Sequence, residues 1–229
     1  MFELNRRLQS IYLDLRKERF NLFLRLLDVS KNKTILDVGG SSQMWHGTGF
    51  ENNVTLLNLT SPKPEDIKQG FKCIQGDALN MYMIEKNEFD IVFSNSVIEH
   101  VGSFDNQKQF ANEIHRVGNS YWVQTPYKYY PIEPHFLFPF FQFLPDLIQK
   151  QIALKWKYSH FKQWNKTHEE ILNNLSEIRL LSAKEFSSLF PSGKLYKEKT
   201  LGLTKSLIVY KTKKTVMGLP SGPLASRRS

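Results

Sequence analysis

A short apolar run that ends in a carboxylate and two glycines constrains the fold of this chain more than any other feature. Residues 33–38 read Lys-Thr-Ile-Leu-Asp-Val, a pattern typical of a buried strand, and Gly39 and Gly40 follow directly. Ligands of open α/β sheets bind beyond the carboxyl ends of the strands, where glycine lets the backbone approach a ligand closely. The run therefore predicts either a ligand-binding turn or an ordinary turn from a strand to a helix.

The turn lacks the signatures of the common phosphate-binding loops. A dinucleotide-binding turn has the order G-x-G-x-x-G, but Ser41 and Met44 occupy the third and sixth positions counted from Gly39. A lysine of the Walker type is missing as well. If the turn binds a ligand, a cationic nucleoside without phosphates suits it best.

Further apolar runs, separated by helical or irregular segments, indicate an α/β fold. They cover residues 54–57, 71–74, 89–93 and 120–123, and residues 107–117 between the last two have helical spacing of apolar side chains. Strands of a parallel sheet are buried on both faces and read as continuous apolar runs, as these do. The first half of the chain therefore predicts a parallel sheet with crossovers on both faces.

The remaining segments extend this prediction toward both ends. We expect an amphipathic helix over 3–28, a strand over 177–181, and an antiparallel pair of strands over 194–199 and 206–210. A helix over 182–190 should begin with a capping box formed by Ser182 and Glu185. The fold class is thus α/β, mostly parallel with a C-terminal antiparallel strand.

Charge and cysteine content limit the other properties of the chain. The formal net charge is +9, and residues 211–229 contribute five Lys or Arg and no acid, so the rest is mildly basic. This tail reads as disordered, or as a segment that attracts nucleic acid or an anionic membrane. The single Cys73 excludes a disulfide within the chain and predicts a buried thiol. The start of the sequence does not read as a signal peptide, and we expect a cytoplasmic protein.

Polar residues follow two other predicted strands. Asp77 and Ala78 come after the third strand, where the carboxylate can accept a hydrogen bond from an adenine amino group, cap a helix, or do both. Asn95 and Ser96 follow the fourth strand and should face the same edge of the sheet. Glu99 and His100 come next, but one acid and one histidine do not make a metal site, and we expect no metal.

Three motifs together resemble the class I S-adenosylmethionine (SAM)-dependent methyltransferases of the type 11 group. They read ILDVGG, QGDAL and FDIVFSNSVIEHV, and the resemblance covers roughly residues 30–125 and the end of the sheet. It implies a Rossmann-like, doubly wound three-layer αβα sandwich that binds SAM. The domain would span residues 31–212, after an N-terminal helix over 1–30 and before the disordered tail over 213–229.

The resemblance also implies roles for individual residues. Asp37, Gly39, Gly40 and Ser41 would line the methionine side of the cofactor, Asp77 and Ala78 would flank adenine, and Asn95 would lie under the sulfur with Ser96 nearby. Two positions depart from the pattern of the family. Ser41 replaces a glycine, and Asn58 replaces the acid that grips the ribose, which an amide bonds more weakly than a carboxylate.

An aromatic insertion over residues 125–168 is the expected acceptor-binding element or lid. It can wall an apolar acceptor pocket, pack on the sheet, or contact a membrane surface as a peripheral element. A base is needed if the acceptor is a hydroxyl, and His100 and His135 are the catalytic candidates. We expect methylation of a small-molecule or lipid-like acceptor and no nucleic-acid partner. The alternatives are a nucleic-acid methyltransferase and a non-catalytic binding subunit.

Overall fold

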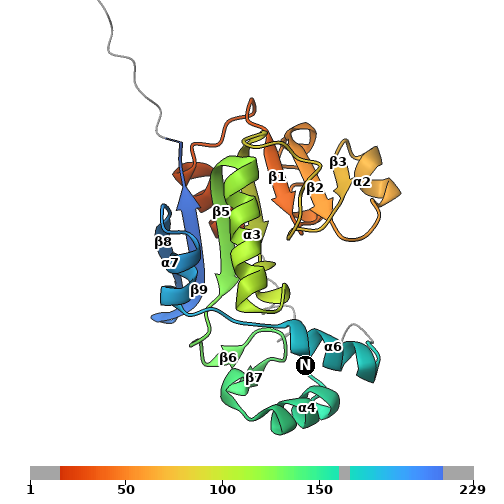
Figure 1. Ribbon diagram of the computed structural model, residues 1–229, viewed down its shortest axis with the longest axis vertical. Helices are drawn as coiled ribbons and strands as arrows, with labels where there is room; N and C mark the ends of the chain where they lie inside the picture. Colours follow the sequence, from red (N-terminus) through yellow and green to blue (C-terminus); the bar gives the residue numbers. More distant parts are fainter. Residues whose placement is uncertain (1–15, 160–165, 214–229) are drawn as a thin grey trace, which may run out of the picture.

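The computed structural model describes residues 16–159 and 166–213. Its main sheet has seven strands in the order β3-β2-β1-β4-β5-β9-β8 (Figure 1). Strands β1 to β5 are parallel to one another, and β9 is antiparallel to both of its neighbours, β5 and β8. The strands are β1 (Ile35–Val38), β2 (Val54–Asn58), β3 (Lys72–Gln75), β4 (Phe89–Asn95), β5 (Gly118–Pro126), β8 (Lys194–Thr200) and β9 (Leu203–Lys211). The predicted α/β class, with its C-terminal antiparallel strand, is confirmed.

One face of the sheet is covered by α3 (Phe104–Val117) and α7 (Ala183–Leu189), which lie in front of it in Figure 1. Helix α3 buries a stripe of apolar side chains on this face, among them Phe110 and Ile114. It begins three residues before the predicted start at 107, because the Ser103 side chain accepts a hydrogen bond from the Asn106 amide at 3.1 Å and caps the first turn. The capping box predicted for α7 is confirmed.

The opposite face is covered by helical residues 16–26, which bear out the predicted N-terminal helix over the part that the structure describes. Residues 3–15 of that prediction lie outside the described residues. Phe23 and Trp45 pack with Phe93 of β4, with ring centroids 4.9 and 5.2 Å from the Phe93 ring. Aromatic packing therefore completes a three-layer sandwich on a face where the connections between strands are short.

Those connections carry little regular helix. Residues 39–53 join β1 to β2 through two short 3-10 helices, η1 (Ser42–Met44) and η2 (Glu51–Asn53). A five-residue helix, α2 (Pro64–Lys68), joins β2 to β3, and an irregular segment leads from β3 to β4. The Trp45 side chain, fully buried after η1, packs against the rings of Phe20, Phe23 and Phe93 on this face.

The insertion after β5 forms a small subdomain with its own core. Its elements are β6 (Ile132–Glu133), β7 (Phe138–Pro139), η4 (Phe141–Phe143), α4 (Asp146–Lys155) and α6 (His168–Glu177). Figure 1 shows the β6–β7 pair, α4 and α6 together, beyond the carboxyl end of β5. Phe136, Phe141, Ala153 and Ile171 are buried against one another there. The subdomain therefore lies at the edge of the sheet where a ligand is expected.

The strand predicted over 177–181 is wrong. Helix α6 extends to Glu177, and the segment after it makes a single β-bridge, between Leu181 and Tyr127. Its backbone groups bond elsewhere, because the Arg179 amide donates to the Glu99 carbonyl at 2.8 Å and the Gln107 side chain donates to the Arg179 carbonyl at 2.9 Å. The apolar run therefore belongs to a crossing segment that returns the chain to the sheet.

Two smaller predictions have mixed outcomes. Cys73 is a free thiol, but it is half-buried on the short edge strand β3 rather than enclosed in the core. In the described ranges, no helix combines the length and the apolar character that crossing a bilayer requires. The predicted disordered tail lies outside the described residues, apart from residue 213.

Candidate functional site

Backbone and side-chain hydrogen bonds bring the predicted cofactor-binding segments to one edge of the sheet. The Gly39 amide donates to the Leu57 carbonyl at 2.8 Å, and the Gly76 amide donates to the Asn58 carbonyl at 2.9 Å. The Asn58 side-chain amide donates to the Gly40 carbonyl at 3.0 Å. The turn after β1 and the ends of β2 and β3 therefore form a single continuous edge.

Both glycines of the turn after β1 are required by the local geometry. Gly39 has a φ of +73°, and a Cβ there would lie 2.6 Å from a methyl carbon of Val97. A Cβ on Gly40 would lie 1.8 Å from the Oδ2 atom of Asp37. Ser41, which follows, is exposed and does not cap η1 with its side chain. The glycines thus allow the chain to pass directly over the Asp37 carboxyl group.

Asp37 is completely buried beneath this turn. The Trp45 indole nitrogen donates to its Oδ2 atom at 2.7 Å, while Oδ1 has no hydrogen-bond partner among the described residues. Burial raises the pKa of this carboxyl to about 7, against the opposing effect of the Trp45 hydrogen bond. The carboxyl group therefore lies under the turn, with one oxygen atom still able to accept a hydrogen bond.

Asp77 is exposed at the end of β3 and does not cap a helix. Its Oδ1 atom accepts a hydrogen bond from the Leu79 amide at 2.8 Å and closes a turn, which also has a β-bridge between Asp77 and Asn80. Ala78 beside it is half-buried. Of the two alternatives left by the sequence, the helix cap is excluded, and the carboxylate faces solvent at the predicted adenine position.

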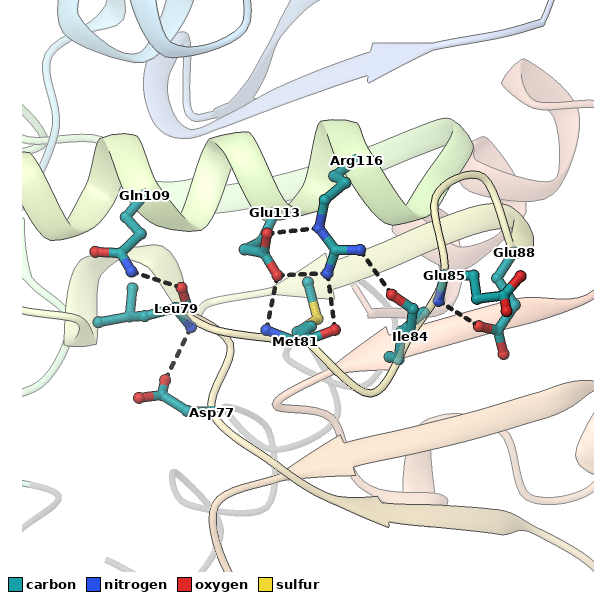
Figure 2. A network of polar contacts seen from close by, with 9 residues as sticks. All are labelled: Asp77, Leu79, Met81, Ile84, Glu85, Glu88, Gln109, Glu113 and Arg116. Atoms are coloured by element: carbon teal, nitrogen blue, oxygen red, sulfur yellow. Dashed lines mark hydrogen bonds and ion pairs between the residues drawn. The ribbon is translucent and has the colours of Figure 1, made fainter.

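Side chains of α3 hold the segment that carries Asp77 and Ala78 (Figure 2). Gln109 donates to the Leu79 carbonyl at 2.8 Å, and Arg116 donates to the carbonyls of Met81 and Ile84 at 2.7 and 2.6 Å. The Glu113 carboxylate accepts a hydrogen bond from the Met81 amide at 2.7 Å and bonds the Arg116 guanidinium through both oxygens. The sequence analysis missed this clamp, although Gln109, Glu113 and Arg116 recur at helical spacing.

Asn95 and Ser96 lie at the end of β4 and point to different partners. The Asn95 Oδ1 atom accepts a hydrogen bond from Arg19 of the N-terminal helix at 3.0 Å. The Arg19 guanidinium also pairs with Glu198 of β8 through two bonds, at 2.9 and 2.6 Å. Ser96, with a φ of 57°, donates its hydroxyl to the Gln124 side chain at 2.9 Å. The predicted sulfur-facing amide is thus held by a cation that a carboxylate neutralises.

The two predicted catalytic histidines meet, although 35 positions separate them in the chain. Their Nε2 atoms are 3.1 Å apart. The Nδ1 atom of His135 lies 2.6 Å from a carboxylate oxygen of Glu133, whose other oxygen accepts two backbone N–H bonds. Glu99, fully buried beside His100, accepts a hydrogen bond from the Thr125 hydroxyl at 3.0 Å. These four residues, Glu99, His100, Glu133 and His135, are called the histidine cluster below.

Burial and mutual charge separate the pKa values within the histidine cluster. Burial, reinforced by the charge of His135, lowers the pKa of His100 to about 4. Burial also acts to lower the pKa of His135, but the hydrogen bond and charge of Glu133, together with the charge of Glu99, outweigh it and raise the pKa. Burial raises the pKa of Glu99 to about 7 despite the opposing charge of His135. One imidazole therefore stays neutral at neutral pH while its neighbour favours the proton.

Comparison with known proteins agrees with this architecture. Residues 39–120, from the turn after β1 into β5, match a family model described as a methyltransferase domain. The PH0226 protein from Pyrococcus horikoshii OT3 has a similar structure, with a TM-score of 0.51 and 15% identity over 87% of this chain and 89% of that one. A Rhodobacter sphaeroides protein named after the Zn-dependent alcohol dehydrogenases has a TM-score of 0.51 and 10% identity, covering 78% and 82%.

A SAM-dependent methyltransferase from Aquifex aeolicus gives a TM-score of 0.47 and 11% identity over 83% of this chain and 87% of that one. No curated protein matches the sequence. At such low sequence identities, a similar structure shows the fold alone, because one fold can serve proteins with different functions.

The sheet order, shared with the PH0226 protein, defines a Rossmann-like α/β protein. With the family match over residues 39–120, the chain is similar to the SAM-dependent methyltransferases of the type 11 group, as its three motifs predicted. It is therefore an enzyme, and SAM is its cofactor.

Proposed function

We propose that this enzyme methylates an oxygen atom of a small, apolar or lipid-like molecule. The observation that supports this most directly is the convergence of His100 and His135 beyond the carboxyl ends of β4 and β5. A hydroxyl must lose its proton to become a good methyl acceptor, and a pair of imidazoles held by carboxylates is suited to that task. The acceptor oxygen would therefore lie at the histidine cluster.

The groups at the carboxyl edge of the sheet fit a cationic nucleoside. When bound, SAM supplies a methyl group already activated by its sulfonium charge. Asp37 offers a buried oxygen without a partner among the described residues, which a cationic group could satisfy. Asn58 is half-buried and Asp77 exposed along the same edge, available for sugar and base. We assign the methionine end to the turn after β1 and the adenine end to Asp77 and Ala78.

The apolar character of the acceptor is inferred from the insertion. A cavity of about 200 Å³ lies in this subdomain and reaches Glu133 of the histidine cluster. Its lining combines the apolar side chains of Phe136, Phe141, Leu175, Ile178 and Leu180 with the polar ones of Lys128, Glu133, Gln142, Gln149 and Arg179. Several large apolar side chains of the same subdomain are also exposed, namely Tyr129, Phe140, Phe143, Leu147 and Ile148. A cavity with an apolar and a polar part, in a subdomain that also exposes apolar side chains, suits a molecule with a hydrocarbon part and a polar group.

Replacement of His135 by alanine tests the proposed function. We expect methyl transfer from labelled SAM to lipid, quinone and other small-molecule extracts to fall about 100-fold or more, because the cluster no longer handles the acceptor proton. Affinity for SAM, measured by calorimetry, should not change, since His135 belongs to the insertion and not to the cofactor edge. His168→Ala is the matched control, because His168 is exposed at the start of α6. Full activity of His135→Ala would remove the cluster from the acceptor site.

A further inference from the structure

We propose that Glu99, His100 and His135 bind a divalent transition-metal ion such as Zn²⁺. Each of the three residues offers one ligand atom, and these atoms all lie within 4.8 Å of one another. Two imidazole nitrogens and one carboxylate oxygen form a donor set that suits zinc and its neighbours in the first transition row. No metal was predicted from the sequence, because Glu99 and His100 alone do not make a metal site and His135 lies 35 positions further along the chain.

The separation of the two imidazole nitrogens matches that of ligands to one ion. The Nε2 atoms of His100 and His135 are 3.1 Å apart. Two nitrogens bound tetrahedrally to zinc, each at about 2.0–2.1 Å, lie about 3.3 Å from each other. A small adjustment of either ring would thus allow both lone pairs to reach the same ion.

Glu133 fixes His135 in the state that a metal ligand needs. Its Oε1 atom lies 2.6 Å from Nδ1 of His135, and its Oε2 atom accepts the backbone N–H groups of His135 and Phe136 at 2.8 and 2.7 Å. A carboxylate that accepts the Nδ1 proton leaves the Nε2 lone pair directed toward His100. Such carboxylate–imidazole pairs orient most histidine ligands in metal sites. Glu133 is therefore a positioning residue rather than a ligand.

Glu99 supplies the negative charge of the site. It is fully buried on η3 (Ile98–His100), the turn directly after β4. Its Oε2 atom accepts the Thr125 hydroxyl bond at 3.0 Å, while Oε1 has no hydrogen-bond partner in the part of the chain that the structure describes. A buried carboxylate oxygen without a partner is costly, and a bound cation would satisfy it.

The site has consequences for the acceptor, and this part of the inference rests on the proposed function. Within the part of the chain that the structure describes, three residues offer ligands, and a tetrahedral ion would use its fourth position for the acceptor, as catalytic zinc sites do. An acceptor hydroxyl bound there would release its proton to solvent more readily, because the ion lowers the pKa of a bound oxygen. With the ion present, this effect replaces proton transfer to the imidazoles, because both rings are then ligands. We therefore infer that the acceptor has an oxygen atom that can bind the ion. The ion would also connect the insertion, through His135, to the turn after β4.

Binding of Co²⁺, a spectroscopic substitute for zinc, tests the site directly. The full-length protein, freed of metal by a chelator, should bind one Co²⁺ ion per chain and give visible absorption typical of low coordination number. Glu99→Gln and His135→Ala should weaken Co²⁺ binding at least 10-fold, and Glu133→Gln should weaken it 10- to 100-fold through loss of orientation. His168→Ala should bind like the wild type. Circular dichroism should show that each variant is folded.

The outcomes separate the metal site from the proposed function. Absence of stoichiometric Co²⁺ binding to the folded wild type, or equal binding by Glu99→Gln, His135→Ala and wild type, overturns the metal site. Binding of Co²⁺ or Zn²⁺ that is lost in these variants supports it, whatever the methyl-transfer assay gives. Stoichiometric metal binding without transfer to any oxygen acceptor contradicts the proposed function alone. Methyl transfer that persists in the chelated protein contradicts the assigned role of the ion.

Discussion

Asp37 is the residue whose ionisation should affect stability most simply. Its pKa is raised from 3.8 to about 7 by burial, so the folded chain keeps the proton over a pH range where the unfolded chain has released it. Between about pH 4 and pH 7 the folded state therefore binds more protons than the unfolded state. The contribution of Asp37 to the free energy of unfolding consequently falls as the pH rises through this window.

Substitution of Asp37 by asparagine should remove this pH dependence. Asparagine cannot ionise, yet its side-chain oxygen can still accept the Trp45 indole bond. We expect Asp37→Asn to gain stability relative to the wild type when the pH rises from 5 to 8, as measured by urea unfolding without SAM. A stability difference that stays constant across this range would show that the carboxyl does not titrate as the structure implies.

Sequence patterns located the site residues but not the environments of their side chains. The strand ending at Val38 predicted the position of Asp37, but its burial depends on Trp45, which reaches it from an irregular connection. Asn58 was predicted to face a ribose, and in the structure its amide also bonds the Gly40 carbonyl. Such contacts depend on loop conformation, which apolar periodicity does not encode.

Helix α3 determines the conformation of the β3–β4 connection through side chains rather than through packing alone. Arg116 satisfies two carbonyl groups of this segment, and Glu113 satisfies the Met81 amide. Side chains of the helix therefore supply hydrogen bonds that an irregular backbone does not make with itself. The proposed adenine contact at Asp77 belongs to the same segment. Cofactor affinity should therefore depend on residues that do not contact the cofactor.

Arg116→Met tests this dependence. The substitution leaves two carbonyl groups and the Glu113 carboxylate without their partner, at a cost of about 1–3 kcal/mol. Amide hydrogen exchange around Met81 should accelerate, and SAM affinity measured by calorimetry should fall. Lys108→Met is the control on the same helix, since Lys108 pairs with Asp105 at an exposed site and its loss should cost under about 0.5 kcal/mol. Equal SAM affinity in both variants would contradict the clamp.

The limits of prediction at the scale of elements follow from the same physics. Strands with continuous apolar runs were predicted correctly from the sequence, and so was the capping box of α7 with both of its residues. Residues 177–181 have the composition of a strand, but no strand of the sheet lies beside them to form a ladder. Pairing is decided by the path of the insertion, which local composition does not report.

Across the whole molecule, one ion pair connects the two ends of the described chain. Arg19 of the N-terminal helix and Glu198 of β8 are 179 positions apart, and their side chains are 11% and 14% exposed. The same guanidinium holds Asn95 at the end of β4. The N-terminal helix is thereby coupled to the cofactor edge and to the last hairpin of the sheet.

A double-mutant cycle with Arg19→Ala and Glu198→Ala should measure this coupling. Each single substitution leaves a largely buried charge without its partner. The loss of unfolding free energy in the double variant should therefore be smaller than the sum of the two single losses, by about 0.5–3 kcal/mol. The measurement is the free energy of urea unfolding for the four proteins. Additive losses would show that the contact contributes nothing to stability.

The arrangement of the sheet was predictable, while the convergence of the histidine cluster was not. The alternation of apolar runs predicted parallel strands, and the final hairpin was also found. The meeting of His100 with His135 depends on how the insertion folds back over the sheet. The sequence did contain a weak signal, because each histidine stands within two positions of a glutamate.

The last strand also affects how copies of this enzyme behave when crowded together. Strand β8 forms one border of the sheet, where unpaired backbone groups invite a neighbouring chain to add as a further strand. Lys194, Lys197 and Lys199 are exposed along it, and its register shifts between Glu198 and Lys199. Like charges and an irregular border both discourage a neighbouring chain from adding to this strand, so we expect little self-association through this border of the sheet.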